Sequence, residues 1–138
     1  MALEAKLKID GKGTEYDILE CEYEFIQPMN NNGLPAGRPS GGLIHFIIIH
    51  NDDNDLLFHE WMIHKTDCKN GKLIFHSTKK NGSISKKTVS FENAYCVRLY
   101  EYFNKHNDTE MYMKITISAN KIFFGEEERE NTTYNSFL

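Results

Sequence analysis

Cysteine is scarce in this chain of 138 residues, and the few cysteines do not form pairs in the sequence. Cys21, Cys68 and Cys96 are odd in number, lie far apart and include no CxxC motif. Disulfide frameworks use an even number of cysteines, and zinc knuckles need closely spaced pairs. We therefore expect reduced, structural thiols and no bound cofactor.

Long apolar runs and basic stretches are also missing. The longest apolar run, Leu43–Ile49, contains His45 and is far shorter than the roughly 20 residues of a membrane helix. Met1–Asp10 carries charged residues between its apolar ones and so lacks the apolar core of a signal peptide. The net charge is -4, whereas nucleic-acid binders usually present a basic face. We expect a protein made in the cytoplasm that neither binds nucleic acid nor inserts into a membrane.

Alternation of apolar and polar residues, typical of half-buried strands, covers most of the chain. Leu3–Asp10 and Tyr16–Phe25 flank the turn residues Asp10-Gly11-Lys12-Gly13, which predicts an opening hairpin. Further strands are expected at Leu43–His50, Lys72–Thr78, Ile84–Phe91, Ala94–Phe103 and Met111–Phe124. Strands that follow one another in hairpins predict a mainly β fold, an antiparallel β-barrel or two packed sheets.

One long loop and one short helix interrupt the strands. Gln27–Gly42 holds all three prolines and exceeds the usual connection length, which is typical of a functional or disordered loop. Asn51–Asp55 has the composition of a helix N-terminus, and apolar residues at helical spacing follow it to about Lys65. The pattern predicts a flanking helix that Trp61 anchors in the core.

The chain is long enough for one domain with one core, which we place at residues 1–125. Residues 126–138 begin with the acidic run Glu126–Glu130, continue with asparagine and threonine, and are expected to form a mobile tail.

Three groups of residues have the composition of metal sites but not their spacing. His59 and His64 resemble the zinc motif HExxH, yet an i, i+5 pair lies about 140° apart around a helix. Asn51-x-Asp53-x-Asp55 resembles the start of a calcium loop, but Leu56 stands where that loop needs glycine. The register of the strands that carry the third group, His45, His50 and His76, is not determined by the sequence. We expect no metal site and no catalytic residues.

Three functions remain open from the residues alone. Strands that are apolar on both faces leave surface that one small domain cannot cover, which favours assembly with copies of the same chain. The first alternative is a monomeric β-barrel that binds a small apolar ligand or a peptide. The second is a metalloenzyme of the jelly-roll type that uses the histidines.

Several motifs in a fixed order extend from about Leu3 to Gly125. They are Gly37-Arg38-Pro39-Ser40 before Gly41-Gly42, Phe58-His59-Glu60-Trp61-Met62, Gly71-Lys72-Leu73-Ile74-Phe75, Phe91-Glu92-Asn93-Ala94-Tyr95-Cys96-Val97 and Ile117-Ser118-Ala119. In this order and spacing the chain resembles the haemolysin-coregulated protein family (Hcp, TssD), the inner tube proteins of type VI secretion systems.

The resemblance implies a β-barrel with one flanking helix that forms hexameric rings, which stack into a hollow tube. It also implies export through the secretion apparatus, with the contractile sheath, the spike protein and effectors as partners. By position, Gln27–Gly42 corresponds to the family's extended loop toward the next ring. The assembly residues expected from this correspondence are Gly37, Arg38, Pro39, Ser40, Gly41 and Gly42.

Overall fold

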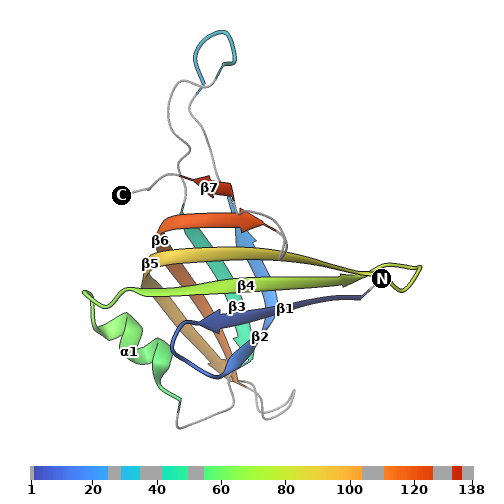
Figure 1. The fold of residues 1–138 in the computed structure, drawn as a ribbon. Helices are drawn as coiled ribbons and strands as arrows, with labels where there is room; N and C mark the ends of the chain where they lie inside the picture. Colours follow the sequence, from blue (N-terminus) through green and yellow to red (C-terminus); the bar gives the residue numbers. More distant parts are fainter. Residues whose placement is uncertain are drawn as a thin grey trace.

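A computed structural model describes residues 2–24, 29–34, 42–49, 55–103, 111–125 and 132–134. Its strands form one antiparallel sheet in the order β3-β2-β1-β4-β5-β6-β7, and an additional pairing of β3 with β6 closes β1 to β6 into a barrel (Figure 1). The predicted mainly β barrel with one helix is confirmed. The strands are β1 (Ala2–Ile9), β2 (Glu15–Tyr23), β3 (Leu43–Ile49), β4 (Lys69–Thr78), β5 (Ile84–Phe103), β6 (Met111–Gly125) and β7 (Thr132–Tyr134).

The alternation along the strands separates the interior of the barrel from its outer surface. On β3, Ile44, Phe46 and Ile48 are buried, whereas the residues between them are only partly covered. Side chains from the facing strands complete the core, so the barrel is filled rather than hollow. The largest fully buried side chains on the strands are Phe91, Leu7, Ile44, Ile48, Leu73, Met113, Ile115, Ile117, Ile122 and Val89.

The strand β5 is longer than the sequence pattern indicates. The two strands expected at Ile84–Phe91 and Ala94–Phe103 are one continuous strand, Ile84–Phe103. Between them, Asn93 has a φ of +51°, and its amide donates a hydrogen bond of 2.9 Å to Oδ1 of Asn70. Asparagine tolerates this left-handed backbone conformation better than most residues, so the strand bends at Asn93 without ending.

The neighbouring strand has a glycine opposite this bend. A Cβ at Gly71 would lie 2.5 Å from the carbonyl oxygen of Lys8 and 2.7 Å from the ring of Phe91. The close approach of β1, β4 and β5 at this point therefore requires glycine.

Three strands continue beyond the barrel as a ribbon, which we call the arm. It consists of Ala2–Ala5 of β1, Phe75–Thr78 of β4 and Ile84–Lys87 of β5. The barrel strand β2 pairs with β1 only at Lys6–Lys8, and β6 pairs with β5 only from Thr88 onward. The arm extends to the right of the barrel in Figure 1, and the N-terminus lies along it.

The helix α1 (Leu57–Ile63) lies against the flank of the barrel beside β5 (Figure 1). It ends at Ile63, before the expected end near Lys65, because His64 adopts an extended conformation. The carbonyl of His64 then accepts a hydrogen bond from the amide of Asp67. Within the described ranges, no helix has the length and apolar character needed to cross a membrane.

The strand β7 lies in the segment that the sequence indicates as a tail. Thr132–Tyr134 pairs with Ile122–Phe124 of β6. This part of β6 extends past the end of its pairing with β3, which covers Tyr112–Ser118. The backbone groups of β6 on that side are thus available to β7. The rest of residues 126–138 lies outside the described part of the chain.

Candidate functional site

The loop residues expected to act in assembly lie almost entirely outside the described part of the chain, which includes Gly42 but not residues 37–41. Gly42 has a φ of +79°, a conformation that favours glycine. Its carbonyl accepts a hydrogen bond of 2.8 Å from the amide of Ala119. Gly42 therefore joins the loop to the start of β3 at a fixed position on β6.

The tip of the same loop, Met29–Leu34, lies beyond the end of the barrel at the top of Figure 1. Oδ1 of Asn30 accepts hydrogen bonds from the amides of Asn32 at 2.9 Å and Leu34 at 3.0 Å. These bonds hold the turn in shape. Met29 and Leu34 are largely exposed, so the tip presents apolar side chains to its surroundings.

The helix is attached to the barrel by its aromatic side chains. Trp61 is 1% exposed, and its Nε1 donates a hydrogen bond of 3.1 Å to the carbonyl of Ala94 on β5. Phe58 is also buried and packs edge to face on Tyr16 of β2, with 4.9 Å between the ring centres. Trp61 thus occupies the core position expected from the sequence.

A buried carboxylate fixes the N-terminal end of this helix. Asp55 accepts hydrogen bonds from the hydroxyl of Tyr16 at 2.5 Å, the amide of Leu57 at 3.1 Å and the ammonium of Lys12 at 3.3 Å. Burial by itself would raise the pKa of Asp55, but these three donors outweigh burial and lower the pKa below its usual value. The carboxylate therefore remains charged and joins the first hairpin to the helix.

The outer surface of β5, β6, β3 and β2, which we call the wall, carries two rows of side chains across its strands. The first row is Arg98, Thr116, His45 and Glu22 in direct register. The second row is Tyr100, Lys114, Ile47 and Glu20. Both rows have a basic residue on β5 or β6 and an acidic residue on β2. The wall therefore has opposite charges along its two sides.

The charges at the two sides of the wall are too far apart to neutralise one another. Within the described residues, Glu20, Glu22 and Arg98 form no ion pair, and Nζ of Lys114 lies 5.7 Å from the centre of the Tyr100 ring. Neighbouring β1 and β2 differ, since their outer charges pair directly: Lys6 with Asp17, and Lys8 with Glu15 at 3.1 Å. On the wall, charge is thus left for another molecule.

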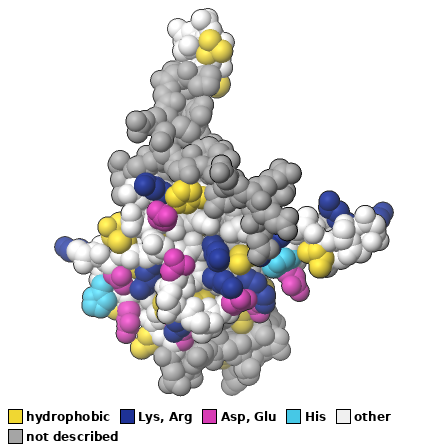
Figure 2. Space-filling model, viewed as in Figure 1, with side chains coloured by type: hydrophobic (Ala, Val, Ile, Leu, Met, Phe, Trp, Pro, Cys, Tyr) yellow, Lys and Arg dark blue, Asp and Glu magenta, His cyan; other side chains and the backbone are white. Residues whose placement is uncertain are grey.

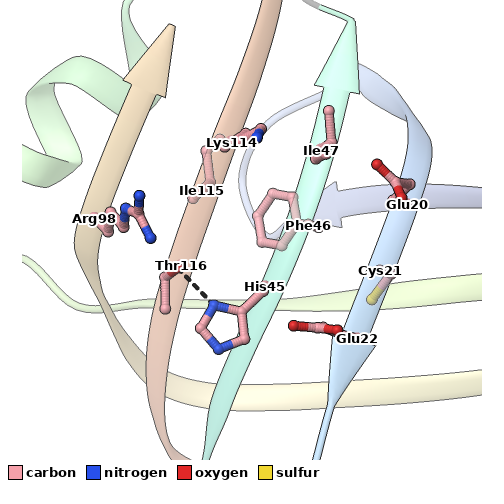
Figure 3. A pocket seen from close by; sticks show the side chains of 10 residues that line it. All are labelled: Glu20, Cys21, Glu22, His45, Phe46, Ile47, Arg98, Lys114, Ile115 and Thr116. Atoms are coloured by element: carbon pink, nitrogen blue, oxygen red, sulfur yellow. Dashed lines mark hydrogen bonds between the residues drawn. The ribbon is translucent and has the colours of Figure 1, made fainter.

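A hollow of about 320 Å³ lies on the wall. Figure 3 shows Arg98, Thr116, His45 and Glu22 side by side along it, and Nδ1 of His45 lies 2.8 Å from the hydroxyl oxygen of Thr116. The side chains around it supply hydrogen-bond donors on one side and carboxylates on the other. Such an arrangement can hold polar groups of a partner in a fixed orientation.

The histidines do not form the site that a jelly-roll metalloenzyme would need. His45 on β3 and His76 on β4 are separated by β2 and β1 in one direction and by β6 and β5 in the other. His45 lies between the buried residues Ile44 and Phe46 and faces out from the barrel, whereas His76 lies on the arm, beyond the barrel. His50 lies outside the described residues.

The histidines of the HExxH-like segment are also separated. His59 pairs with Glu101 of β5, and His64 follows the end of the helix. In the ranges that the structure describes, no three His, Cys, Asp or Glu side chains come together as ligands for a metal ion.

Of the cysteine thiols, Cys96 is buried and Cys21 is partly buried. Burial raises the pKa of Cys21 and the pKa of Cys96 to about 11 each. Because the thiolate is the reactive form, both thiols are poor nucleophiles at neutral pH. Cys68 is exposed and directly precedes β4.

The fold matches solved structures over nearly its whole length. Hcp1 from Flavobacterium johnsoniae matches with a TM-score of 0.72 and 23% sequence identity, over 96% of this chain and 99% of that chain. Hcp1 from Salmonella typhimurium matches with a TM-score of 0.73 and 12% identity, over 99% and 96%. A chain of the anti-feeding prophage baseplate, whose structure is 6-fold symmetrised, matches with a TM-score of 0.53 and 9% identity, over 92% and 94%.

No curated protein sequence matches the chain. The model of the family described as hemolysin coregulated protein Hcp (TssD) matches residues 1–132 and so extends past Gly125 into β7. A match over nearly the whole chain agrees with the barrel, the flanking helix and the order of the sequence motifs. The chain therefore belongs to the Hcp (TssD) family, the tube proteins of type VI secretion systems.

Proposed function

We propose that this chain forms hexameric rings by contacts between the basic and acidic sides of the wall, and that the rings stack into a secretion tube. The observation that carries the proposal is the pair of rows from Arg98 to Glu22 and from Lys114 to Glu20. Membership of a tube-protein family and the likeness to a 6-fold symmetrised baseplate support the same assembly.

Opposite charges on two different sides of one subunit favour a head-to-tail contact. A contact of this kind repeats around a rotation axis and closes into a ring. A two-fold contact that placed the same side of two copies together would bring like charges into contact, which costs free energy. The charge pattern thus favours a head-to-tail contact over a two-fold contact that joins the same side of two copies.

The domain and the remaining roles follow from this proposal. One barrel domain would occupy residues 1–125, with 126–138 as an appendage to which β7 belongs. The protein would act mechanically and not as an enzyme, be made in the cytoplasm and leave through the secretion apparatus. Its partners would be other copies, the contractile sheath, the spike protein and effectors. A monomeric ligand-binding barrel has less support, because core side chains fill the barrel interior.

Charge reversal tests the ring contact. We expect the double variant Glu20→Lys, Glu22→Lys to reduce the fraction of chains in rings by about tenfold or more, because it places like charges at the contact. The double variant Arg98→Glu, Lys114→Glu should reduce that fraction equally, for the same reason. A chain with all four changes should recover rings, since the opposite charges are restored with their positions exchanged. The readouts are mass by light scattering and negative-stain images of rings.

Lys72→Glu on β4 is the control, since β4 is not part of the wall. It should leave ring formation unchanged although it also reverses a positive charge. If both double variants formed rings as well as the unmodified chain, the wall would not be the ring contact. A monomeric mass for the unmodified chain at high concentration would exclude the tube function itself.

The loop supplies a separate prediction. Replacing Arg38 and Pro39 with alanine should impair stacking of rings more than ring formation, because the resemblance places this loop between rings. Electron microscopy separates the two effects, since single rings and tubes differ in length. Unchanged tube formation would contradict the assignment of the loop.

A further inference from the structure

The arm has two strand edges that no described strand covers. On β1, residues 2–5 pair with β4 on one side, while the pairing with β2 begins at Lys6. On β5, residues 84–87 pair with β4, while the pairing with β6 begins at Thr88. Backbone amides and carbonyls at such edges can pair with a further strand.

Side chains on the arm distinguish its two edges. Glu4, His76 and Lys86 are in direct register across β1, β4 and β5 and therefore lie on one face of the ribbon. This row has its acidic residue at the β1 edge and its basic residue at the β5 edge. Figure 2 shows the arm clear of the body of the molecule, with basic side chains near its tip, where Lys79 and Lys80 are exposed.

We propose that the arms of neighbouring copies pair edge to edge, β1 residues 2–5 of one copy against β5 residues 84–87 of the next. The inference builds on the proposed assembly of copies and assigns it a second contact. The two edges have the same length, and Glu4 of one copy meets Lys86 of the other.

The orientation of the strands allows this pairing without inverting a subunit. Strands β1 and β5 both run antiparallel to β4 and are thus parallel to each other. A copy displaced sideways and rotated about a ring axis presents β5 parallel to the β1 edge of its neighbour. Pairing of two β1 edges or two β5 edges would place Glu4 near Glu4 or Lys86 near Lys86. Like charges disfavour both of those arrangements.

A second copy of this chain fits the two edges in both charge and apolar surface, which is why we propose it as the partner. Leu3 is 72% exposed on the β1 edge, and Ile84 is 68% exposed on the β5 edge. Each edge therefore presents an apolar residue beside a charged one, and the two charges have opposite sign. A head-to-tail pairing covers apolar surface at both edges and joins the charges.

Disulfide trapping between copies tests the pairing directly. Leu3 and Ser85 occupy the row next to Glu4 and Lys86, with Ser77 of β4 between them. In one chain they are two inter-strand spacings apart, roughly 9–10 Å, which exceeds the reach of a disulfide. A bond between cysteines at these positions must therefore join two copies.

The protein used is the full chain with Cys68→Ser, since Cys68 is exposed, whereas Cys96 is buried and Cys21 is partly buried. Copies with Leu3→Cys are mixed with copies carrying Ser85→Cys and oxidised under mild conditions. We expect covalent dimers from the mixture and none from either variant alone. A chain with both changes should give a ladder of cross-linked oligomers on a denaturing gel.

Other outcomes overturn the proposal in distinguishable ways. Rings in electron micrographs without cross-links would show that assembly is correct and arm pairing is wrong. Dimers from Leu3→Cys copies alone would show a two-fold contact and contradict the head-to-tail pairing. Cross-linked dimers without rings would uphold arm pairing and refute the tube function, and neither rings nor cross-links would refute both.

A charge exchange that leaves the cross-linking positions intact provides a second test. Glu4→Lys or Lys86→Glu should each lower the yield of cross-linked dimer about threefold or more, because an opposite-charge pair becomes a like-charge pair. The two changes in one chain should restore the yield. Equal yields from all variants would refute the Glu4–Lys86 contact.

Discussion

Replacing Trp61 with alanine is expected to destabilise the protein by about 3–5 kcal/mol, the usual cost of deleting a buried aromatic side chain. Trp61 is 1% exposed, and its ring centre lies 6.3 Å from that of Phe58. The change would also leave the carbonyl of Ala94 without the indole donor. Unfolding in urea, followed by circular dichroism, measures the loss.

Two variants show whether packing or the hydrogen bond matters more at this position. Trp61→Phe keeps an aromatic ring in the core but removes the Nε1 donor, so it should cost less than Trp61→Ala. Met62→Ala removes a partly exposed neighbour and should change stability by about 0.5 kcal/mol or less. If Trp61→Ala cost no more than Met62→Ala, the helix would not be anchored through this residue.

Replacing Asp55 with asparagine is expected to lower stability at neutral pH by about 1.5–3 kcal/mol, the range for hydrogen bonds to a charged group. The pKa of Asp55 is lower in the folded protein than its ordinary value of 3.8. Its stabilising effect is therefore fully present above that value and is lost as the pH falls through the folded pKa. The difference between the unmodified chain and Asp55→Asn should thus narrow in strong acid.

Urea unfolding at several pH values checks the prediction. Asp17→Asn is the matched control, because Asp17 is an exposed carboxylate that pairs with Lys6. An exposed pair contributes about 0–1 kcal/mol, so this variant should change stability little at any pH. A pH-independent loss for Asp55→Asn would show that the charge of Asp55 does not stabilise the fold.

The strands were largely predictable because their signal is local. Alternation in Leu3–Asp10 and in Met111–Phe124 depends only on which side chains face the core. The unbroken course of β5 was not predictable, since it depends on the left-handed conformation of Asn93 and on the hydrogen bond that its amide donates to Asn70 of another strand. The strand β7 was missed because the backbone of β6, and not an apolar pattern of its own, gives it a partner.

Predicting the charged rows would have required the register between the strands, and a single sequence does not contain that register. Glu20 and Glu22 are visible as acidic residues on a strand, and Arg98 and Lys114 as basic residues on two others. That they fall into the same two rows depends on the pairing of β3 with β6, which closes the barrel over long separations in sequence. The position of Trp61 was easier to predict, because the burial of a large aromatic residue at helical spacing follows from the neighbouring sequence alone.

The unbroken course of β5 also has a mechanical consequence. The same strand passes through the arm, past the helix and along the wall, and it pairs with β4 from Ile84 to Ala94 and with β6 from Thr88 to Phe103. A force along the arm therefore acts in shear on many interstrand hydrogen bonds at the same time. It does not break them one after another, as a force that unzips two strands would. A subunit built this way can pass a force along β5 from one neighbour to the next while keeping its own shape.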